Sequence, residues 1–418
     1  MSASISRRRL LGWTGAGAAV AGVGAVSGYA LGRTEPDPVH EPGGDVVEFR
    51  GTHQAGIVTP SQNELYFTAL DLTSTGKAAV QRMLAQWTSA AERMTRGLET
   101  AENGALPLDR ETAPADTGEA LELPPSSLTV TVGFGPTFFD KLGITDRRPA
   151  TLADLPSFQG DRLEPAKSGG DICIQACAND PQVAVHAVRN LVRIGFGTVA
   201  VRWAQLGYGR TSSTSIRQPT ARNLFGFKDG TNNLKAEEPD LLDQHVWVQG
   251  GDGPDWMTGG THLVARRIRM HIETWDRAPL DEQEAVIGRT KGTGSPLGGT
   301  GEFEPANYRS IDANGTPVIP LNSHIRLASA ESLNGIKILR RGFNFVAGSD
   351  DRGHLNGGLF FVCFVRNPQT QFVPMQRALA GKDAMMDYIQ HTGSAVFACP
   401  PGVREGEYWG QRLLEDTV

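Results

Sequence analysis

The sequence has few cysteines and no excess of basic residues. Four cysteines in 418 residues are too few for a disulfide scaffold, and none forms the CxxC pair typical of zinc and redox sites. We therefore expect buried free thiols rather than bridges. The formal charge is -6, so the composition does not favour binding to the phosphate backbone of a nucleic acid.

Several common catalytic motifs are also missing. The chain has no phosphate-binding P-loop, no GxSxG nucleophile elbow and no HExxH zinc motif. Nucleotide hydrolysis, ester hydrolysis and zinc proteolysis therefore lack their minimum apparatus. The GFG triplets at 133–135 and 195–197 do not meet the dinucleotide-binding fingerprint. Any activity must depend on another combination of residues.

The N-terminus has the pattern of a twin-arginine export signal. Arg7, Arg8 and Arg9 precede a weakly apolar stretch, 13–31, that is rich in glycine and alanine. A membrane anchor is the weaker alternative, because the stretch is short and weakly apolar for a stable span. The proline-rich, acidic segment 33–45 indicates a disordered linker. We expect residues 1–45 to direct export by the twin-arginine translocase, to the cell envelope or the extracellular space.

The first half of the remaining chain has the apolar spacing of alternating strands and helices. The order strand-helix-strand-strand-helix-strand is the ferredoxin-like arrangement. The proline- and acid-rich segment 105–126 is expected to be an exposed loop. The predicted strands are 64–72, 127–134, 171–178 and 198–205, and the predicted helices are 77–98 and 181–194.

The second half predicts further strands and helices around one long loop. The Gly- and Pro-rich segment 292–322 is long for a loop inside a compact domain, and such loops are usually functional or disordered. Because 418 residues exceed the usual size of one domain, we expect two, at 46–222 and 223–418. The predicted strands are 262–273 and 359–365, and the predicted helices are 281–288 and 383–391.

Three segments of the second half contain residues suited to redox chemistry. GFKDGTNN at 226–233 places Asp229 between two glycines, NSHIRL at 322–327 contains His324, and ILRRGFNF at 338–345 contains Arg340 and Arg341. By itself, Asp229 fits better a turn aspartate that hydrogen-bonds its own backbone. Together, a carboxylate, a histidine and an arginine are the protein groups that a haem peroxidase needs.

The haem iron of such an enzyme needs one protein ligand, and a neutral imidazole is the usual donor. His324 is one candidate among the nine histidines. His262 and His271 are alternatives because they lie in a predicted amphipathic strand. His391 follows a predicted helix, and it equally fits a cap on the C-terminal end of that helix.

On the open face of the iron, cleavage of the peroxide O–O bond needs a group that moves a proton between the two oxygens. Asp229 suits this role, and an aspartate remains a competent base at mildly acidic pH. A permanently charged arginine stabilises the charge that develops on the leaving oxygen. Successive strand residues point to opposite faces, so only one of Arg340 and Arg341 can line the cavity.

The three segments resemble, in order and spacing, the signature of the dye-decolourising peroxidases. The resemblance runs from about residue 50 to the end and includes the segment 387–402. It implies two ferredoxin-like domains of α+β class with antiparallel sheets, and haem b in the second domain. It also implies that His324 is the axial ligand, Asp229 the distal aspartate and Arg340 the distal arginine. The export signal and the Arg340-Arg341-Gly342 sequence look most like the branch with secreted dye peroxidases and deferrochelatases.

Other residues are candidates for supporting roles around the haem. Asp387, ahead of Asp383, is expected to hydrogen-bond the second nitrogen of His324, although a solvated helix face or a helix cap explains either carboxylate. Arg309 in the long loop, with Thr231 and Asn232, is expected to pair with the haem propionates. A surface ion pair is the alternative for Arg309.

The resemblance predicts a haem peroxidase that reduces hydrogen peroxide and oxidises organic donors such as dyes and phenols through a ferryl intermediate. Two alternatives stay open: deferrochelatase-like release of iron from haem, and non-catalytic haem binding. Nucleic acid is not expected as a partner, and self-association into a homo-oligomer is a weak expectation.

Overall fold

The structure is a computed structural model in which residues 45–415 are described. The predicted export signal and nearly all of the predicted linker lie outside these described residues. Within 45–415, no helix has the length and apolar character needed to cross a membrane. The division of the folded part at residue 222 stays a prediction.

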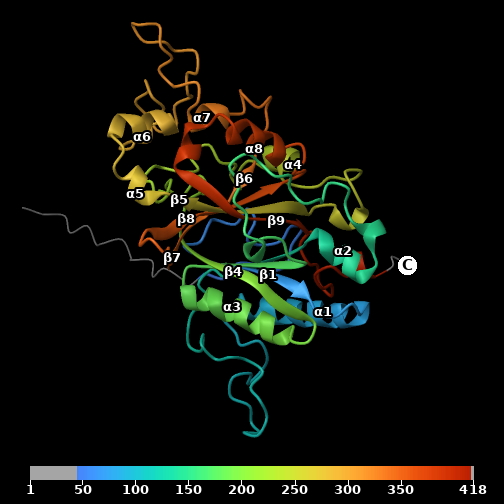
Figure 1. Cartoon of the computed structure of the whole chain (residues 1–418). Helices are drawn as coiled ribbons and strands as arrows, with labels where there is room; N and C mark the ends of the chain where they lie inside the picture. The colour runs from blue at the N-terminus through green and yellow to red at the C-terminus, as the bar shows by residue number, and fades with distance from the viewer. Residues whose placement is uncertain (1–44, 416–418) are drawn as a thin grey trace, which may run out of the picture. The chain divides into compact units, whose positions relative to one another are not determined.

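The first half forms the expected strand-helix-strand-strand-helix-strand unit. Its antiparallel strands lie in the order β4-β1-β3-β2, and α1 and α3 lie against one face of this sheet (Figure 1). The elements are β1 (Glu64–Leu72), α1 (Lys77–Met94), β2 (Thr129–Phe134), β3 (Ile172–Ala178), α3 (Pro181–Ile194) and β4 (Val199–Arg210), with the short α2 (Pro136–Leu142), η1 (Thr145–Arg147) and η2 (Pro165–Lys167) inserted. Segment 105–126 contains no helix or strand, as predicted.

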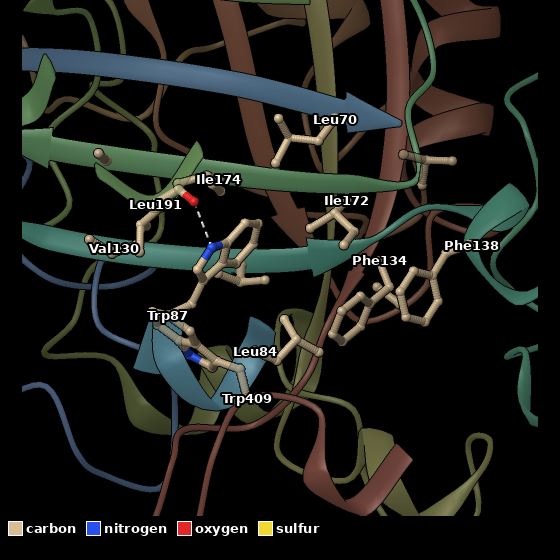
Figure 2. Close-up of a cluster of buried hydrophobic side chains, with 14 of the residues drawn as sticks. Leu70, Leu84, Trp87, Val130, Phe134, Phe138, Ile172, Ile174, Leu191 and Trp409 are labelled. Atoms are coloured by element: carbon tan, nitrogen blue, oxygen red, sulfur yellow. Dashed lines mark hydrogen bonds between the residues drawn. The ribbon is translucent and has the colours of Figure 1, made fainter. Parts of the chain in front are cut away.

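The face of this sheet that α1 and α3 cover is tightly packed (Figure 2). Leu84 and Trp87 of α1 are fully buried against β-strand residues and against Trp409 from the C-terminal segment. The indole N–H of Trp87 donates a 2.7 Å hydrogen bond to the carbonyl of Leu191 at the end of α3. Burying each such large apolar side chain contributes about 1.5–3 kcal/mol, so this layer anchors the first half.

The second half repeats the same strand order, β7-β8-β5-β9. Its helices α6, α7 and α8 lie on the opposite side of the structure from α1 and α3, and α7 packs against α6 and α8 (Figure 1). The strands are β5 (Thr261–Met270), β6 (Leu339–Arg340), β7 (Phe343–Ser349), β8 (Leu355–Val365) and β9 (Ile389–Cys399). The helices are α4 (Pro239–His245), η3 (Asp255–Met257), α5 (Ile272–Trp275), α6 (Leu280–Ile287), α7 (His324–Leu327), α8 (Phe372–Ala380), η4 (Ala384–Asp387) and α9 (Gln411–Leu414).

The two four-stranded sheets join into one closed antiparallel barrel. Tyr208 of β4 pairs with Asn344 of β7, and Phe134 of β2 pairs with Ala398 of β9. Alternate residues of both sheets fill the interior with aromatic and small side chains, and all four cysteines are buried and free. The predicted α+β class with antiparallel sheets and the predicted free thiols are therefore confirmed.

The predicted helix 383–391 is wrong. Only Ala384–Asp387 form a short 3-10 helix, and the chain then enters β9 at Ile389. Pairing of β9 with β5 from Met270 to Thr261 satisfies its backbone groups in an extended form, which overrides the local helical spacing. The predicted strand 262–273 likewise ends at Met270, and α5 follows it.

Candidate active site

The Asp229 turn depends on its two flanking glycines. Gly226 and Gly230 have φ values of 80° and 84°, a region that favours glycine. A Cβ at Gly230 would also lie 2.9 Å from the Cα of Ser212. The backbone N–H of Asp229 donates a 2.9 Å hydrogen bond to the carbonyl of Ala221. The turn therefore holds the carboxylate of Asp229 in one place.

Asp229 and Arg340, which are 111 residues apart, form an ion pair. Nη1 of Arg340 donates to Oδ1 of Asp229 over 2.6 Å, and both side chains are partly buried. Nδ2 of Asn223 donates to Oδ2 of Asp229 over 3.3 Å. The structure thus brings together the two residues that the sequence suggested for the open face of a haem.

Asn233 holds the backbone of Arg340 in place. The Arg340 N–H donates to Oδ1 of Asn233 over 2.7 Å, and Nδ2 of Asn233 donates back to the Arg340 carbonyl over 2.8 Å. The next side chain, Arg341, is fully buried and donates to the Thr59 carbonyl and to Oε1 of Gln62. Arg340 and Arg341 therefore point in different directions, as predicted, and only Arg340 lines the cavity.

His324 begins the short helix α7, and its Nδ1 lies 2.6 Å from Oδ2 of Asp383. The other oxygen of Asp383 accepts the Met385 backbone N–H over 2.9 Å, and this buried carboxylate caps η4. Burial works to lower the pKa of His324, but the Asp383 carboxylate outweighs it and the pKa lies above its ordinary value. In the neutral ring, Asp383 fixes the proton on Nδ1 and leaves the lone pair on Nε2.

The prediction that Asp387 is the partner of His324 is therefore wrong. Asp387 is exposed at the end of η4, whereas Asp383 precedes η4 and is buried. The predicted helix would have placed both carboxylates one turn apart, on one face. Because the segment makes one 3-10 turn and then becomes a strand, Asp383 points to His324 and Asp387 faces solvent.

His324, Asp229 and Arg340 line one large cavity. Its empty space, including the open mouth, is about 1590 Å³. Much of the wall is apolar, and its residues come from β5, β8, α8 and β9: Ile268, Met270, Leu359, Phe361, Phe372, Met375, Leu379 and Ile389. Such walls suit a large, flat, apolar ligand.

These residues fit haem better than a bare metal ion. Within residues 45–415, no group of three or more His, Cys, Asp or Glu side chains is arranged to hold a metal. The cavity instead offers one imidazole, whose Nδ1 is already bonded to a carboxylate, and this is the usual state of a metal-ligating histidine. One imidazole is sufficient when a porphyrin supplies the other iron ligands.

The other candidate histidines are less suited to hold the iron. His262 has both ring nitrogens engaged, with the Thr151 hydroxyl and the Arg366 carbonyl. His271 does not line the cavity. His391 does, but it is deeply buried, and burial and the Arg266 charge lower its pKa to about 3. His324 alone combines a place in the cavity with a partner that orients the ring.

The structure does not place Arg309, the predicted propionate partner, at the cavity. Its side chain is exposed and does not line the cavity, whereas Thr231 and Asn232 do. Arg289, just beyond the end of α6, lines the cavity instead and donates from Nη1 to the carbonyls of Gly294 and Glu302. Burial lowers the pKa of Arg289, as expected for a guanidinium with little water around it. The sequence did not indicate that Arg289 lines the cavity, because it is a single arginine after a helix, outside any recognised motif.

The long loop 292–322 contributes Tyr308 to the lining of the cavity. Its Glu302 forms an ion pair with Lys228 and accepts a 3.1 Å hydrogen bond from the hydroxyl of Thr231. Tyr308 lines the cavity and donates from its hydroxyl to the Ile325 carbonyl over 3.0 Å. The loop therefore ties the Asp229 turn to α7, which carries His324.

Comparisons with known proteins identify the family of this chain and several relatives. The N-terminal family of Dyp-type peroxidases matches residues 54–209, and the C-terminal family matches 220–404. A dye-decolorizing peroxidase of Thermobifida fusca is 38% identical, covering 98% of this chain and 97% of its own. A deferrochelatase of Yersinia pestis is 35% identical, covering 99% and 95%. The structure of ferric DtpA from Streptomyces lividans matches with a TM-score of 0.83 and 37% identity, covering 91% and 100%.

Proposed function

Because the chain belongs to the Dyp-type peroxidase family and is a haem-dependent peroxidase, we propose which of its residues bind the haem and which take part in the reaction with hydrogen peroxide. The cavity binds one haem b, with Nε2 of His324 on the iron. The observation that carries this proposal is the His324–Asp383 hydrogen bond in the same cavity as the Asp229–Arg340 ion pair. When bound, haem supplies the iron that binds hydrogen peroxide and holds the oxidising equivalents.

Asp229 moves the proton that allows the peroxide O–O bond to break. Oδ1 of its carboxylate is held by Arg340, and Oδ2 has only a long hydrogen bond to Asn223. With haem bound, Oδ2 would be the atom that accepts a proton from hydrogen peroxide and returns it to the oxygen that leaves as water. Arg340 keeps Asp229 oriented, and its guanidinium charge stabilises the negative charge that develops on the leaving oxygen.

Arg289, Thr231 and Asn232 hold the haem carboxylates. All three line the cavity, and the guanidinium of Arg289 is fixed by two backbone carbonyls. An arginine held in this way loses little side-chain freedom when it binds a carboxylate. These residues would hold the charged edge of the haem next to the Asp229 turn and the end of α6.

Export by the twin-arginine translocase, to the cell envelope or the extracellular space, is also part of the proposal. Arg7, Arg8 and Arg9 ahead of the weakly apolar segment 13–31 support it. The translocase accepts proteins that are already folded, which suits an enzyme that takes up its cofactor in the cytoplasm. Replacement of Arg7 and Arg8 by lysine is expected to retain the protein in the cytoplasm, and unchanged secretion would refute this route. Self-association stays a prediction.

The activity is tested by adding hydrogen peroxide and a phenol to the haem-loaded protein. We expect repeated turnover of the phenol while the porphyrin keeps its iron, followed by absorbance and fluorescence. Deferrochelatase is the second candidate because the Yersinia pestis relative has that name. Appearance of fluorescent, iron-free protoporphyrin would favour that candidate, and stable haem with no response to peroxide would favour simple haem binding.

A further inference from the structure

A second cavity lies next to the haem cavity and shares a wall with it. Its empty space is about 1030 Å³, including the open mouth. Ile336, in the segment between α7 and β6, lines both cavities. We call this second cavity the outer cavity; its lining includes Pro149, Thr151, His245, Val248, Asp252, Gly253, Met257, His262, Asn334, Ile336, Arg366, Asn367 and Thr370.

His245 is a buried polar residue in the lining of the outer cavity. Its side chain belongs to a residue only 8% exposed, and its ring makes no hydrogen bond to any other residue in the described range 45–415. Burial, together with the nearby charge of Lys337, lowers the pKa of His245, so its imidazole is neutral. A neutral imidazole in this position can accept a hydrogen bond, and then a proton, from the hydroxyl of a ligand.

One wall of the outer cavity suits a small aromatic ring without a net charge, whereas most of the remaining lining is polar. Pro149, Val248, Met257 and Ile336 supply an apolar wall, and methionine sulfur packs well against aromatic rings. The charged groups there already neutralise each other. Arg366 binds Asp252 through Nε and Nη2, over 2.6 and 2.8 Å.

The wall between the two cavities is held firmly. Nε2 of Gln371 donates hydrogen bonds of 2.9 Å to the carbonyls of both His245 and Lys337. The backbone N–H of Arg366 also donates to the His245 carbonyl over 2.8 Å. These bonds join the end of α4 to the start of α8, which lie together in Figure 1, and to the segment that contains Ile336. A ligand next to His245 is therefore separated from the haem cavity by a fixed layer of protein.

We propose that the outer cavity binds a small phenol, with its hydroxyl on His245, as an electron donor to the haem across the wall at Ile336. This inference rests on the proposed peroxidase function. The phenol O–H bond breaks, its proton goes to the ring nitrogen of His245, and its electron goes to the haem that hydrogen peroxide has oxidised. His245 then releases the proton to water at the open mouth of the outer cavity before the next phenol binds. Two phenols give two phenoxyl radicals, and their two electrons, with two protons taken up from water, account for reduction of one hydrogen peroxide to two waters.

The first test measures phenol binding by NMR, on haem-loaded protein and without hydrogen peroxide. In Gly253→Leu the new side chain starts from a Cβ with no atom within 4 Å and fills open space at the cavity. The matched control is Gly250→Leu, where a Cβ also meets nothing within 4 Å but which does not line the cavity. We expect Gly253→Leu to weaken phenol binding at least about tenfold, and Gly250→Leu to bind as the wild type does.

His245→Phe keeps the size of the ring and removes its nitrogens. Loss of one hydrogen bond is expected to weaken phenol binding about two- to tenfold, and to raise KM for phenol by a similar factor. Oxidation of a dye too bulky for the outer cavity should remain within about twofold of wild type in both variants. This readout separates a donor site from a general defect in peroxide reduction.

The inference is overturned if wild-type protein does not bind phenol, or if phenol binding and KM are the same in wild type, Gly253→Leu and His245→Phe. A failure of the peroxidase proposal has a different result, namely that the haem spectrum does not respond to hydrogen peroxide even with bulky dyes. In that case phenol binding that depends on Gly253 and His245 would support the site and refute its role as an electron donor.

Discussion

One buried carboxylate determines which nitrogen of His324 faces the cavity. Asp383 accepts a hydrogen bond from Nδ1 through one oxygen and caps η4 through the other. Nε2 is therefore the nitrogen that can bind iron, and negative charge on Asp383 strengthens the imidazole as a donor. This pair is central to haem binding in the proposed site.

Asp383→Asn is expected to weaken haem affinity about 10- to 100-fold, because a neutral amide supports a metal-bound imidazole less well than a carboxylate. The amide oxygen can still accept the Met385 N–H, so η4 should persist. Haem titration followed by absorbance measures the affinity. Asp387→Asn is the matched control and should bind haem as the wild type does; equal losses in the two variants would refute the assignment of Asp383.

At the residue scale, the sequence alone was sufficient to predict the site residues that lie in short sequence motifs. Asp229, His324 and Arg340 lie in one cavity, as the three segments suggested. Asn233 was not predicted to have a role, and Asp387 was ranked ahead of Asp383, because these contacts depend on where a turn ends and which strand follows. No local sequence pattern distinguishes Asp383 from Asp387 or indicates the contacts of Asn233.

Among the elements, the turn at 226–233 has a backbone that requires glycine at two positions. Gly226 and Gly230 have positive φ, and Gly230 lies close against Ser212. The turn is tied to the long loop through Glu302 and to β6 through the Asp229–Arg340 pair. Its shape therefore determines the position of Asp229 relative to the haem.

Gly230→Ala is expected to lower the free energy of unfolding by about 1–3 kcal/mol, since a non-glycine residue is strained at this φ and its Cβ would press on the Ser212 backbone. It should also slow the reaction with peroxide by displacing Asp229. Chemical denaturation and stopped-flow absorbance measure the two effects. Gly315→Ala, with φ of 81° and open space around its Cβ, should share the strain but not the slower reaction. Equal reaction rates in both variants would refute the argument.

Helices and strands were predicted accurately where the spacing of apolar residues along the sequence matches the pattern of burial in the structure. The strand 64–72 and the helix 181–194 have the predicted bounds. The helix predicted at 383–391 failed because its last residues begin β9, which pairs with β5 inside the closed barrel. Strands whose partners lie more than a hundred residues away are determined by tertiary pairing rather than by local spacing.

At the scale of the whole fold, residues 45–415 include two histidines that are buried in strands of the barrel, His262 and His391. Burial lowers the pKa of His262 to about 4, and burial with the Arg266 charge lowers that of His391 to about 3. Below about 6.5, the unfolded chain binds protons at these positions that the folded chain does not. Stability from these two groups is therefore present above pH 6.5 and is lost as the pH falls.

The free energy of unfolding is expected to decrease as the pH falls from about 6.5 to 4, with His262 alone accounting for about 3 kcal/mol at pH 4. Urea denaturation at a series of pH values measures this loss. His262→Gln should reduce the slope of the free energy of unfolding against pH by the amount that corresponds to nearly one proton. His354→Gln, at an exposed histidine, should leave this slope unchanged. A dependence that is the same in His262→Gln and wild type would show that His262 does not contribute.

The central claim is that His324 holds the haem while Asp229 moves the proton of the peroxide. It is tested most directly by stopped-flow absorbance after mixing haem-loaded protein with one equivalent of hydrogen peroxide. We predict that Asp229→Asn keeps the wild-type haem content and resting spectrum but reacts roughly 10²- to 10⁴-fold more slowly, and that His324→Ala has a changed resting spectrum or no haem. A wild-type rate in Asp229→Asn, or an unchanged haem spectrum in His324→Ala, would contradict the account.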